Sequence, residues 1–280
     1  MSTIVHDPAV VRAAFDRLAP DYDRMTSGDT FQLQRAQAHR ALMRWLPPQC
    51  RVLEIGCGTG VDTLLLARFG LHVTACDPSE AMVSRTLARL SAGGVADRVD
   101  VIACGLDDLP ALLAVRERHE AFDAIVSGFG ALNCVPALDA LGAVAANHLR
   151  SGGKVAIGLL GRSCAWESFY FTVTGRRELA ARRRRSGPVD VPVAGFDVPA
   201  VYHRPADILA ALGARFTLEA RTGLGIIVPP PYLETRWQQL PPMLRRLVAR
   251  ADQVAAGCPG LNRLGDHVLL CWAKQRSAGV

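Results

Sequence analysis

The stretch RVLEIGCGTG, which spans Arg51 to Gly60, decides the fold of this 280-residue chain. It begins as a short apolar strand, and Glu54 stands near the carboxyl end of that strand. A glycine turn follows, and a helical pattern starts at Val61. This order predicts a nucleotide site, because glycines let the backbone approach a ligand and the helix N-terminus offers unpaired N–H donors. The glycines of the turn are Gly56, Gly58 and Gly60.

The spacing of these glycines indicates which nucleotide to favour. A dinucleotide fingerprint, G-x-G-x-x-G/A, needs Gly or Ala where this chain has Val61. From Glu54 onward the chain has acidic-x-Gly-x-Gly-x-Gly, which resembles motif I of the class I S-adenosylmethionine-dependent methyltransferases. An NAD-dependent oxidoreductase is the enzymatic alternative. A protein that binds the cofactor without using it is the non-enzymatic one.

A second strand, His72 to Cys76, ends at Asp77, 17 residues after Gly60 (77 − 60). A carboxylate at the tip of the second strand can accept both ribose hydroxyls, which adenosylmethionine and NAD share. The alternative is that Asp77 caps the helix that begins beyond Pro78. The combination of strand, glycine turn, strand and acid favours the ligand interpretation.

Length and composition predict one domain with an insertion, since half of the 280 residues are apolar. No apolar run approaches the ~20 residues of a membrane span, and the start of the chain lacks the pattern of a signal peptide. We therefore expect a cytoplasmic protein. The eight cysteines form no C-x-x-C pair and are interpreted as reduced core thiols, with Cys57 lining the cofactor. No catalytic metal is expected, because acids are missing after the fourth strand.

The net charge of +6 is concentrated in an arginine-rich run, at Arg176, Arg177 and the four residues Arg182 to Arg185. Such a run is typical of a solvated helix face, and we expect a solvated or lid surface here. Binding of RNA or DNA is the alternative, weakened because no aromatic residues interleave with the run to stack bases. Pro229 to Tyr232, PPPY, lacks the acceptor of amino-methylating DNA enzymes and is interpreted as a rigid turn.

The N-terminal segment, residues 1–48, predicts a helical cap. We expect a helix from Pro8 to Leu18, a tight Ala-Pro-Asp-Tyr-Asp link and a second helix from Phe31 to Trp45. FDRLAPDYDRM resembles the same segment of the ubiquinone/menaquinone-type methyltransferases. The resemblance implies that Tyr22 folds over the cofactor and that Arg35, or Arg40 instead, meets the methionine carboxylate.

The resemblance also assigns contacts further along the chain. Met82 falls where relatives present an apolar side chain to the adenine, although a place in the core is an equal alternative. Relatives carry Gly-Asp after the third strand, whereas here Leu106 follows the glycine and Asp107 comes one place later, so the contact falls to Asp107 or to the backbone. The fourth strand, Phe122 to Ser127, ends at the reaction centre. Its expected contacts are Ser127 and Gly128 for the cofactor, and Phe129 and Asn133 for the substrate. The alternative for Asn133 is a cap on a helix from Pro136 to Leu149.

After the fifth strand, Lys154 to Leu160, residues 161–204 predict a substrate lid inserted before the sixth strand. We expect helices up to Arg185 and then a short antiparallel excursion ending at Tyr202, a candidate substrate contact. His203 is the candidate general base, should the acceptor be a hydroxyl. The alternative is that His203 only packs beside the helix from Pro205 to Leu212.

The last part of the chain predicts a strand from Arg215 to Val228, a helix from Pro242 to Ala256 and a final strand from His267 to Ala273. In that helix the apolar residues share one side and the arginines look outward. The resemblance implies an α/β doubly wound sheet of seven strands, mostly parallel with the last strand reversed, and helices on both faces.

The expected activity is O-, N- or C-methylation of a small molecule by S-adenosylmethionine, with S-adenosylhomocysteine as the product. A tRNA, rRNA or DNA methyltransferase is an alternative. Methyl transfer relies on orientation and exclusion of water, so a catalytic base is weak or absent in this interpretation.

Overall fold

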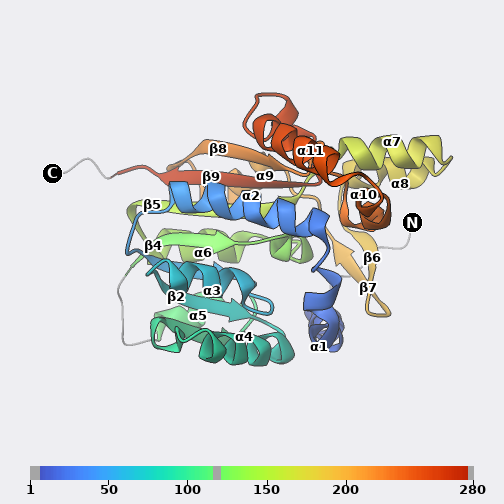
Figure 1. Cartoon of the computed structure of the whole chain (residues 1–280). Coiled ribbons are helices and arrows are strands. Elements are labelled where there is room, and N and C mark those ends of the chain that lie inside the picture. Colours follow the sequence, from blue (N-terminus) through green and yellow to red (C-terminus); the bar gives the residue numbers. More distant parts are fainter. Residues whose placement is uncertain (1–6, 116–120, 277–280) are drawn as a thin grey trace.

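The computed structural model describes residues 7–115 and 121–276, and its centre is a seven-stranded sheet (Figure 1). Strands β1 to β5 pair in parallel, and β9 runs antiparallel to both of its neighbours. The doubly wound sheet with a reversed last strand is therefore confirmed. In sheet order the strands are β3 (Val99–Ala103), β2 (His72–Asp77), β1 (Arg51–Ile55), β4 (Phe122–Ser127), β5 (Leu149–Leu160), β9 (His267–Lys274) and β8 (Phe216–Leu224).

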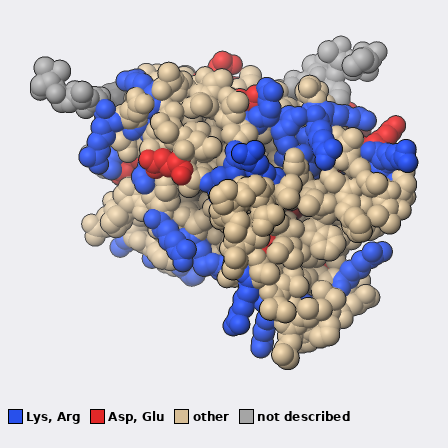
Figure 2. Space-filling model, turned by 90° about the horizontal axis from the view of Figure 1, so that it is seen from above, with Lys and Arg blue, Asp and Glu red and all other residues tan. Residues whose placement is uncertain are grey.

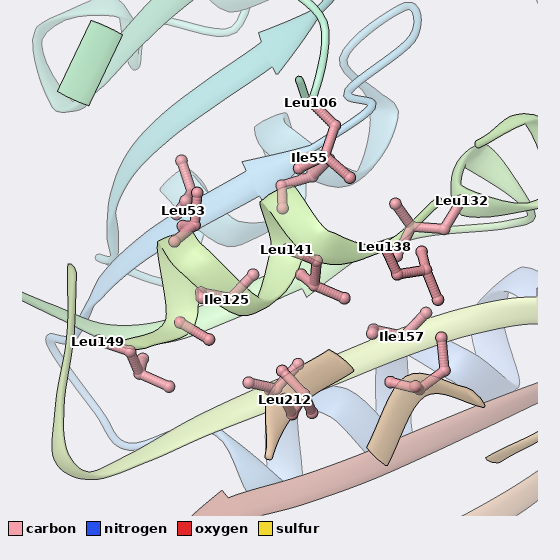
Figure 3. Packing of buried hydrophobic residues seen from close by; sticks show 14 of the residues in the cluster. Leu53, Ile55, Leu106, Ile125, Leu132, Leu138, Leu141, Leu149, Ile157 and Leu212 are labelled. Carbon is pink, nitrogen blue, oxygen red and sulfur yellow. The ribbon is translucent and has the colours of Figure 1, made fainter. Parts of the chain in front are cut away.

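Helices cover both faces of the sheet, so the inner strands are apolar on both sides. Successive strand residues point to opposite faces. Leu53 joins the core on one face and Val52 the core on the other. Figure 3 shows the first of these cores. That face carries α5 (Leu109–Ala114), α6 (Asp139–His148) and α9 (Pro205–Leu212), and the other carries α2 (Asp29–Trp45), α3 (Val61–Arg68) and α4 (Glu80–Ala92).

The tight link expected at residues 19–23 is wrong, because α1 is one helix, Pro8–Met25, that continues through Pro20. Contacts with the rest of the fold hold both halves of α1. Asp16 accepts a hydrogen bond from the Ser79 hydroxyl at 2.6 Å, and Asp23 accepts one from the Thr59 hydroxyl at 2.7 Å. These contacts outweigh the backbone hydrogen bond that a proline inside a helix removes.

The start of α2 at Asp29, two residues before the expected Phe31, also has a distant cause. Glu234 accepts hydrogen bonds from the backbone N–H groups of Asp29 and Thr30, both at 3.0 Å. It thereby satisfies N–H groups that the first turn of a helix leaves unpaired. Glu234 begins the short helix α10 (Glu234–Gln238), 205 residues away from Asp29 in the sequence.

Residues 161–204 form an insertion between β5 and α9. It contains helices α7 (Ala165–Val173) and α8 (Arg177–Ala181), and a hairpin of β6 (Val189–Val193) and β7 (Phe196–Ala200). The hairpin packs against α1 through a small apolar cluster of Val11, Ala14 and Val198. The insertion and the N-terminal helix therefore meet over the carboxyl ends of the parallel strands (Figure 1).

The helix expected at residues 242–256 is present as α11, Pro242–Ala255. Arg246 and Arg250 look outward as predicted, but the apolar side does not face the protein. The apolar residues Met243, Leu247 and Val254 are exposed, whereas Asp252 is buried. Hydrogen bonds from the Ile227 and Val228 backbone to Asp252 fix this orientation.

Within residues 7–115 and 121–276, no helix combines the length and apolarity of a bilayer span.

Candidate functional site

A cavity of about 370 Å³ lies at the carboxyl ends of β1, β2 and β4 and is covered by α1. This is where open α/β sheets bind ligands, and the volume lies within the range of small-molecule sites. Twelve of the predicted cofactor or substrate residues line it: Tyr22, Arg35, Gly56, Cys57, Gly58, Asp77, Pro78, Met82, Leu106, Asp107, Gly128 and Phe129. Asp107, the side-chain alternative for the adenine contact, therefore faces the cavity, and Asp108 lines it as well.

The glycine turn forms the floor of the cavity. Gly56 has φ of +75°, and a Cβ atom there would lie 2.3 Å from the Ala131 Cβ, so only glycine fits. A Cβ atom at Gly58 would meet nothing within 4 Å, which leaves open space above the turn. Gly60 has a different role, because it lies against Thr86 of α4 and is not part of the cavity wall.

Asp77 stands beside this floor and is held by two backbone groups. Its Oδ2 accepts the Gly58 N–H and its Oδ1 accepts the Ser79 N–H, both at 2.9 Å. The cap of α4 is Ser79, whose hydroxyl accepts the Met82 N–H at 3.1 Å, so Asp77 is not the cap residue. Burial raises the pKa of Asp77 to about 6, although these N–H groups lower it.

Glu54 and Ser127 lie behind the wall of the cavity and not on it. Both are buried, at 2% and 1% exposure, because their strands turn the neighbouring residues Ile55 and Gly128 toward the cavity. Burial raises the pKa of Glu54 to about 8, and the charge of Asp62 adds to this effect. The structure therefore gives Glu54 a supporting position beneath the turn in place of the expected direct contact.

A charged cluster that the sequence interpretation missed lies at one end of the cavity. The Asp62 Oδ1 accepts a hydrogen bond from the His39 Nε2 at 2.7 Å and lies 3.7 Å from the Arg35 Nε. The other carboxylate oxygen of Asp62, Oδ2, lies against Gly128. A Cβ atom added at Gly128 would be only 2.5 Å from this oxygen. His39 is partly buried here. The available signal was spacing, since Arg35 and His39 are four residues apart on one helix face.

The electrostatics of this cluster keep opposite charges side by side. Burial acts to raise the pKa of Asp62, but the hydrogen bond from His39 and the charge of Arg35 outweigh it and lower the pKa. Arg35 is also buried and lies over two aromatic rings, 4.8 Å from the Phe31 centroid and 5.4 Å from the Phe129 centroid. Arg40 is exposed and does not line the cavity, so the geometry favours Arg35 over Arg40.

Aromatic side chains complete the wall. Phe129 has φ of +29°, a strained value for a residue with a side chain. Its ring lies 5.3 Å from the Phe31 ring and 5.6 Å, edge to face, from the His267 ring. Tyr22 lines the cavity from α1, and burial raises its pKa to about 12, partly opposed by Arg35. These rings close the cavity around the Arg35 guanidinium.

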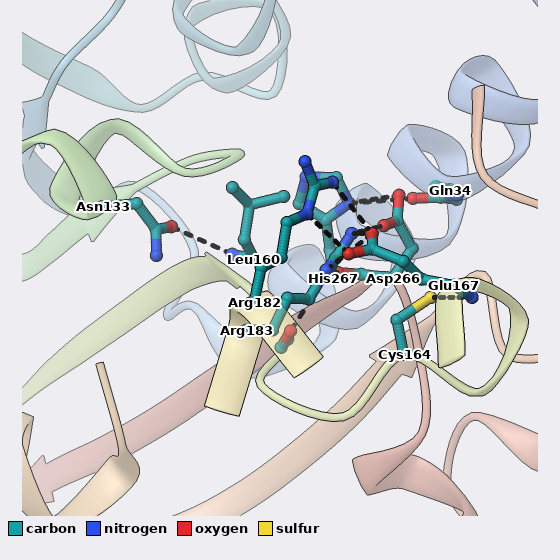
Figure 4. A network of polar contacts seen from close by, with 10 residues as sticks. Gln34, Asn133, Leu160, Cys164, Glu167, Arg182, Arg183, Asp266 and His267 are labelled. Atoms are coloured by element: carbon teal, nitrogen blue, oxygen red, sulfur yellow. Dashed lines mark hydrogen bonds and ion pairs between the residues drawn. The ribbon is translucent and has the colours of Figure 1, made fainter. Parts of the chain in front are cut away.

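The expected roles of Asn133 do not fit its position. Its Nδ2 donates to the Val201 carbonyl at 2.7 Å, and its Oδ1 accepts the Leu160 N–H at 2.9 Å. The second of these bonds is visible in Figure 4. Asn133 does not cap α6 either, because the residue before that helix is Leu138. Its amide joins the end of β5 to the return from the insertion.

His203 and Tyr202 also lie outside the cavity wall. The His203 Nε2 lies 2.8 Å from the Val135 carbonyl and 3.2 Å from the Leu132 carbonyl. Carbonyls only accept, so this nitrogen carries a proton that it donates to them. The packing alternative for His203 agrees with the structure and the general-base expectation does not. Tyr202 is buried, and the Arg183 guanidinium lies 5.7 Å from its ring.

The arginine run is partly buried, which contradicts a fully solvated surface. The Arg182 Nε donates to the Glu167 Oε1 at 2.7 Å, and the Arg183 Nη2 donates to the Asp266 Oδ1 at 2.7 Å (Figure 4). Burial acts to raise the pKa of Asp266, but His267 and Arg183 outweigh it and hold the pKa well below its usual range. Arg184 and Arg185 are exposed, as the sequence predicted.

Comparison with known proteins shows what part of this chain is similar to proteins of known class. Residues 52–153 match the family model described as a methyltransferase domain. The chain is 33% identical over 156 residues to a demethylmenaquinone methyltransferase of Clavibacter sepedonicus, covering 54% of this chain and 58% of the relative. It is 33% identical over 134 residues to a ubiquinone biosynthesis O-methyltransferase of Xanthomonas axonopodis pv. citri, covering 48% and 52%. The matches thus span somewhat more than half the length of these curated relatives.

Solved structures show the same fold. A putative S-adenosylmethionine-dependent methyltransferase from Listeria monocytogenes matches with a TM-score of 0.57 and 19% identity, covering 88% of this chain and 100% of that one. The [4+2]-cyclase SpnF matches with a TM-score of 0.60 and 18% identity, covering 99% and 100%. The fold and the glycine-turn cavity thus define a Rossmann-like domain. Residues 52–153 match the methyltransferase-domain family, and the fold is similar to that of solved S-adenosylmethionine-dependent methyltransferases.

Proposed function

We propose that this chain transfers a methyl group from S-adenosylmethionine to a small-molecule acceptor. The observation that carries the proposal is one cavity with two different polar ends. Asp77 ends β2, and Asp62, paired with Arg35, lies against Gly128 after β4, on the other side of β1. Adenosylmethionine has matching ends, a ribose with two hydroxyl donors and an amino acid with one charge of each sign. NAD has no such amino acid end.

Each end of the cavity suits one part of the cofactor. Asp77 is placed to accept the ribose hydroxyls, and Met82 and Leu106 offer apolar contact to the adenine. Arg35 suits the methionine carboxylate, because a guanidinium binds a carboxylate through several N–H donors. Asp62 suits the ammonium group. Tyr22, from α1, covers the cavity on the open side of the sheet, in agreement with the role that the family resemblance gives it.

The acceptor side of the cavity is apolar. Pro8, Val11 and Phe15 of α1 face it, together with Leu132 and Val135. In the parts of the chain that the structure describes, no histidine lines the cavity. Bound S-adenosylmethionine would supply a methyl group on a sulfonium: the acceptor nucleophile would bond to the methyl carbon in line as the carbon–sulfur bond breaks and S-adenosylhomocysteine leaves. The residues of this chain then contribute by orienting the two reactants and excluding water, and no side chain is assigned as a base.

Calorimetry and a turnover assay test the proposal. We expect saturable binding of S-adenosylhomocysteine and none of NADH at the same concentrations. With small aromatic or apolar hydroxyl, amine and thiol compounds as acceptors, S-adenosylhomocysteine should be released in proportion to methylated product. Binding of NADH without a response to S-adenosylhomocysteine would end the proposal. Cofactor binding with methylation only of RNA or DNA would reassign the acceptor.

A further inference from the structure

The helix α11 turns Arg245, Asp252 and Ala255 toward the protein and its larger apolar residues outward. The Asp252 Oδ1 accepts the backbone N–H groups of Ile227 at 2.6 Å and Val228 at 3.0 Å. Arg245 pairs with Asp29 at the start of α2, across 2.9 Å. These contacts satisfy backbone donors after β8 and fix the rotation of the helix about its axis. An amphipathic helix on a protein surface usually turns its large apolar residues toward the protein.

This orientation leaves an apolar surface uncovered, which we call the α11 stripe. It consists of Met243, Leu244, Leu247 and Val254, at spacings that place them on one side of the helix. Their exposed fractions are 83%, 41%, 64% and 72%. Single exposed apolar residues need no explanation, but a contiguous set of this kind marks a contact surface.

The charges around the α11 stripe are positive. Arg246 and Arg250 of the same helix are exposed, and the only acid of the helix, Asp252, is buried. Figure 2 views the molecule from the side on which α11 lies in Figure 1, and basic side chains gather on this face with few acidic ones between them. Long arginine side chains can lie along an apolar surface while their charged heads reach a polar layer.

We propose that the α11 stripe docks on the surface of an anionic lipid membrane. A bilayer interface offers an apolar layer for Met243 and Leu247 and phosphate groups for Arg246 and Arg250, as it does for amphipathic helices that lie in the interface plane. A second copy of the chain fits less well. Two stripes packed face to face would bring the arginines of both helices together, with no exposed acid on either helix to pair with them.

The test uses the full chain and sedimentation with lipid vesicles. The chain should bind vesicles of phosphatidylglycerol and phosphatidylcholine, bind pure phosphatidylcholine at least tenfold more weakly, and lose binding as salt rises. The double variant Met243→Ser/Leu247→Ser should lose tenfold or more of its binding to the anionic vesicles. The double variant Arg246→Gln/Arg250→Gln should lose about tenfold on anionic vesicles and little on neutral ones.

A matched control is Phe69→Ser/Leu87→Ser, which removes two apolar residues of 59% and 51% exposure from α3's end and from α4. It should bind vesicles as the parent does, and all three variants should keep the circular dichroism spectrum of the parent. No vesicle binding by the parent, or equal loss in the control, would overturn the proposal. A concentration-dependent dimer in analytical ultracentrifugation that only Met243→Ser/Leu247→Ser abolishes would also overturn it and assign the stripe to a second copy.

Discussion

The Arg183 Nη2 donates to the Asp266 Oδ1 across 2.7 Å, at a place where both side chains are buried. Arg183 belongs to the insertion, whereas Asp266 directly precedes β9 in the central sheet. Arg183 also donates to the backbone carbonyls of Gly161 and Asp266, at 3.1 and 2.8 Å. His267, next to Asp266, touches the Phe129 ring on the cavity wall. The insertion is therefore held to the sheet at Asp266, one residue before His267, whose ring contacts Phe129 in the cavity wall.

Replacing Arg183 with Gln should destabilise the protein. The change removes the Arg183 charge from Asp266 and Glu167, which keep only His267 and Arg182 as charged neighbours. The removal of one member of a buried ion pair costs about 3 kcal/mol. Urea unfolding followed by circular dichroism measures this loss. Arg184→Gln is the control, because Arg184 is exposed and its loss should change the free energy of unfolding by less than about 0.5 kcal/mol. Equal stability of both variants would contradict the role of the buried pair.

Replacing Asp62 with Asn should weaken binding of the amino acid end of the cofactor. We expect the affinity for S-adenosylhomocysteine to fall by about 1 to 3 kcal/mol, because the ammonium group loses its charged acceptor. The affinity for 5′-methylthioadenosine, which lacks the amino acid, should change little. Calorimetry with both ligands separates the two effects. An equal loss for both ligands would indicate a general disturbance of the glycine turn.

Asp77 should make cofactor binding depend on pH. Its pKa of about 6 in the folded chain means that the carboxylate, the form proposed to accept two ribose hydroxyls, prevails above pH 6. Between pH 7.5 and 5 the affinity for S-adenosylhomocysteine should fall by about tenfold, because about one carboxyl in ten stays ionised at one unit below its pKa. Asp77→Asn should flatten this profile. Asp77→Ala should weaken binding by about 1 to 3 kcal/mol at pH 7.5.

The raised pKa of Asp77 also makes the stability of the fold depend on pH. The folded pKa of Asp77 is raised above its unfolded value, so the folded state binds the proton more tightly. The stabilisation of the folded state by the protonated Asp77 is therefore fully present below the unfolded pKa and is lost as pH rises through about 6. Above that pH, Asp77→Asn should cost less stability than it does at pH 5. Thermal unfolding at the two pH values measures the difference, and an equal cost at both would contradict the assigned shift.

The sequence predicted the parts of the site that are local in the chain. The strand, the glycine turn and Asp77 lie within residues 51–77, and their roles follow from the spacing of glycines and from strand ends. Tyr22, Arg35 and Met82 also line the cavity, and these residues were assigned by the family resemblance. The sequence did not indicate a site role for Asp62, because that role depends on contacts with Arg35 and His39, which belong to another helix.

The incorrect expectations involve partners that lie far apart in the sequence. Asn133 bonds to Val201 across 68 residues, and Arg183 bonds to Asp266 across 83. No periodicity reports such contacts, so the amide and the guanidinium were given a site role and a solvent role. The apolar side of α11 was predicted in the wrong direction for a similar reason. The hydrogen bonds from the Ile227 and Val228 backbone to Asp252 outweigh the hydrophobic pattern of the helix.

His203 provides the sharpest distinction between a catalytic and a structural histidine. Its Nε2 proton is donated to the carbonyls of Leu132 and Val135, so the ring holds the turn after β4 against the chain that returns from the insertion. His203→Asn should therefore lower the free energy of unfolding by about 1 to 2 kcal/mol, since it leaves buried carbonyls without their donor. Once an acceptor is known, the turnover rate of folded His203→Asn should stay within a few-fold of the parent, with the same pH profile. Removal of a general base would instead cost ~10²-fold or more and would abolish the corresponding limb of that profile. A loss of this size, with unchanged stability and unchanged affinity for S-adenosylhomocysteine, would return His203 to the reaction and require the ring to turn toward the cavity.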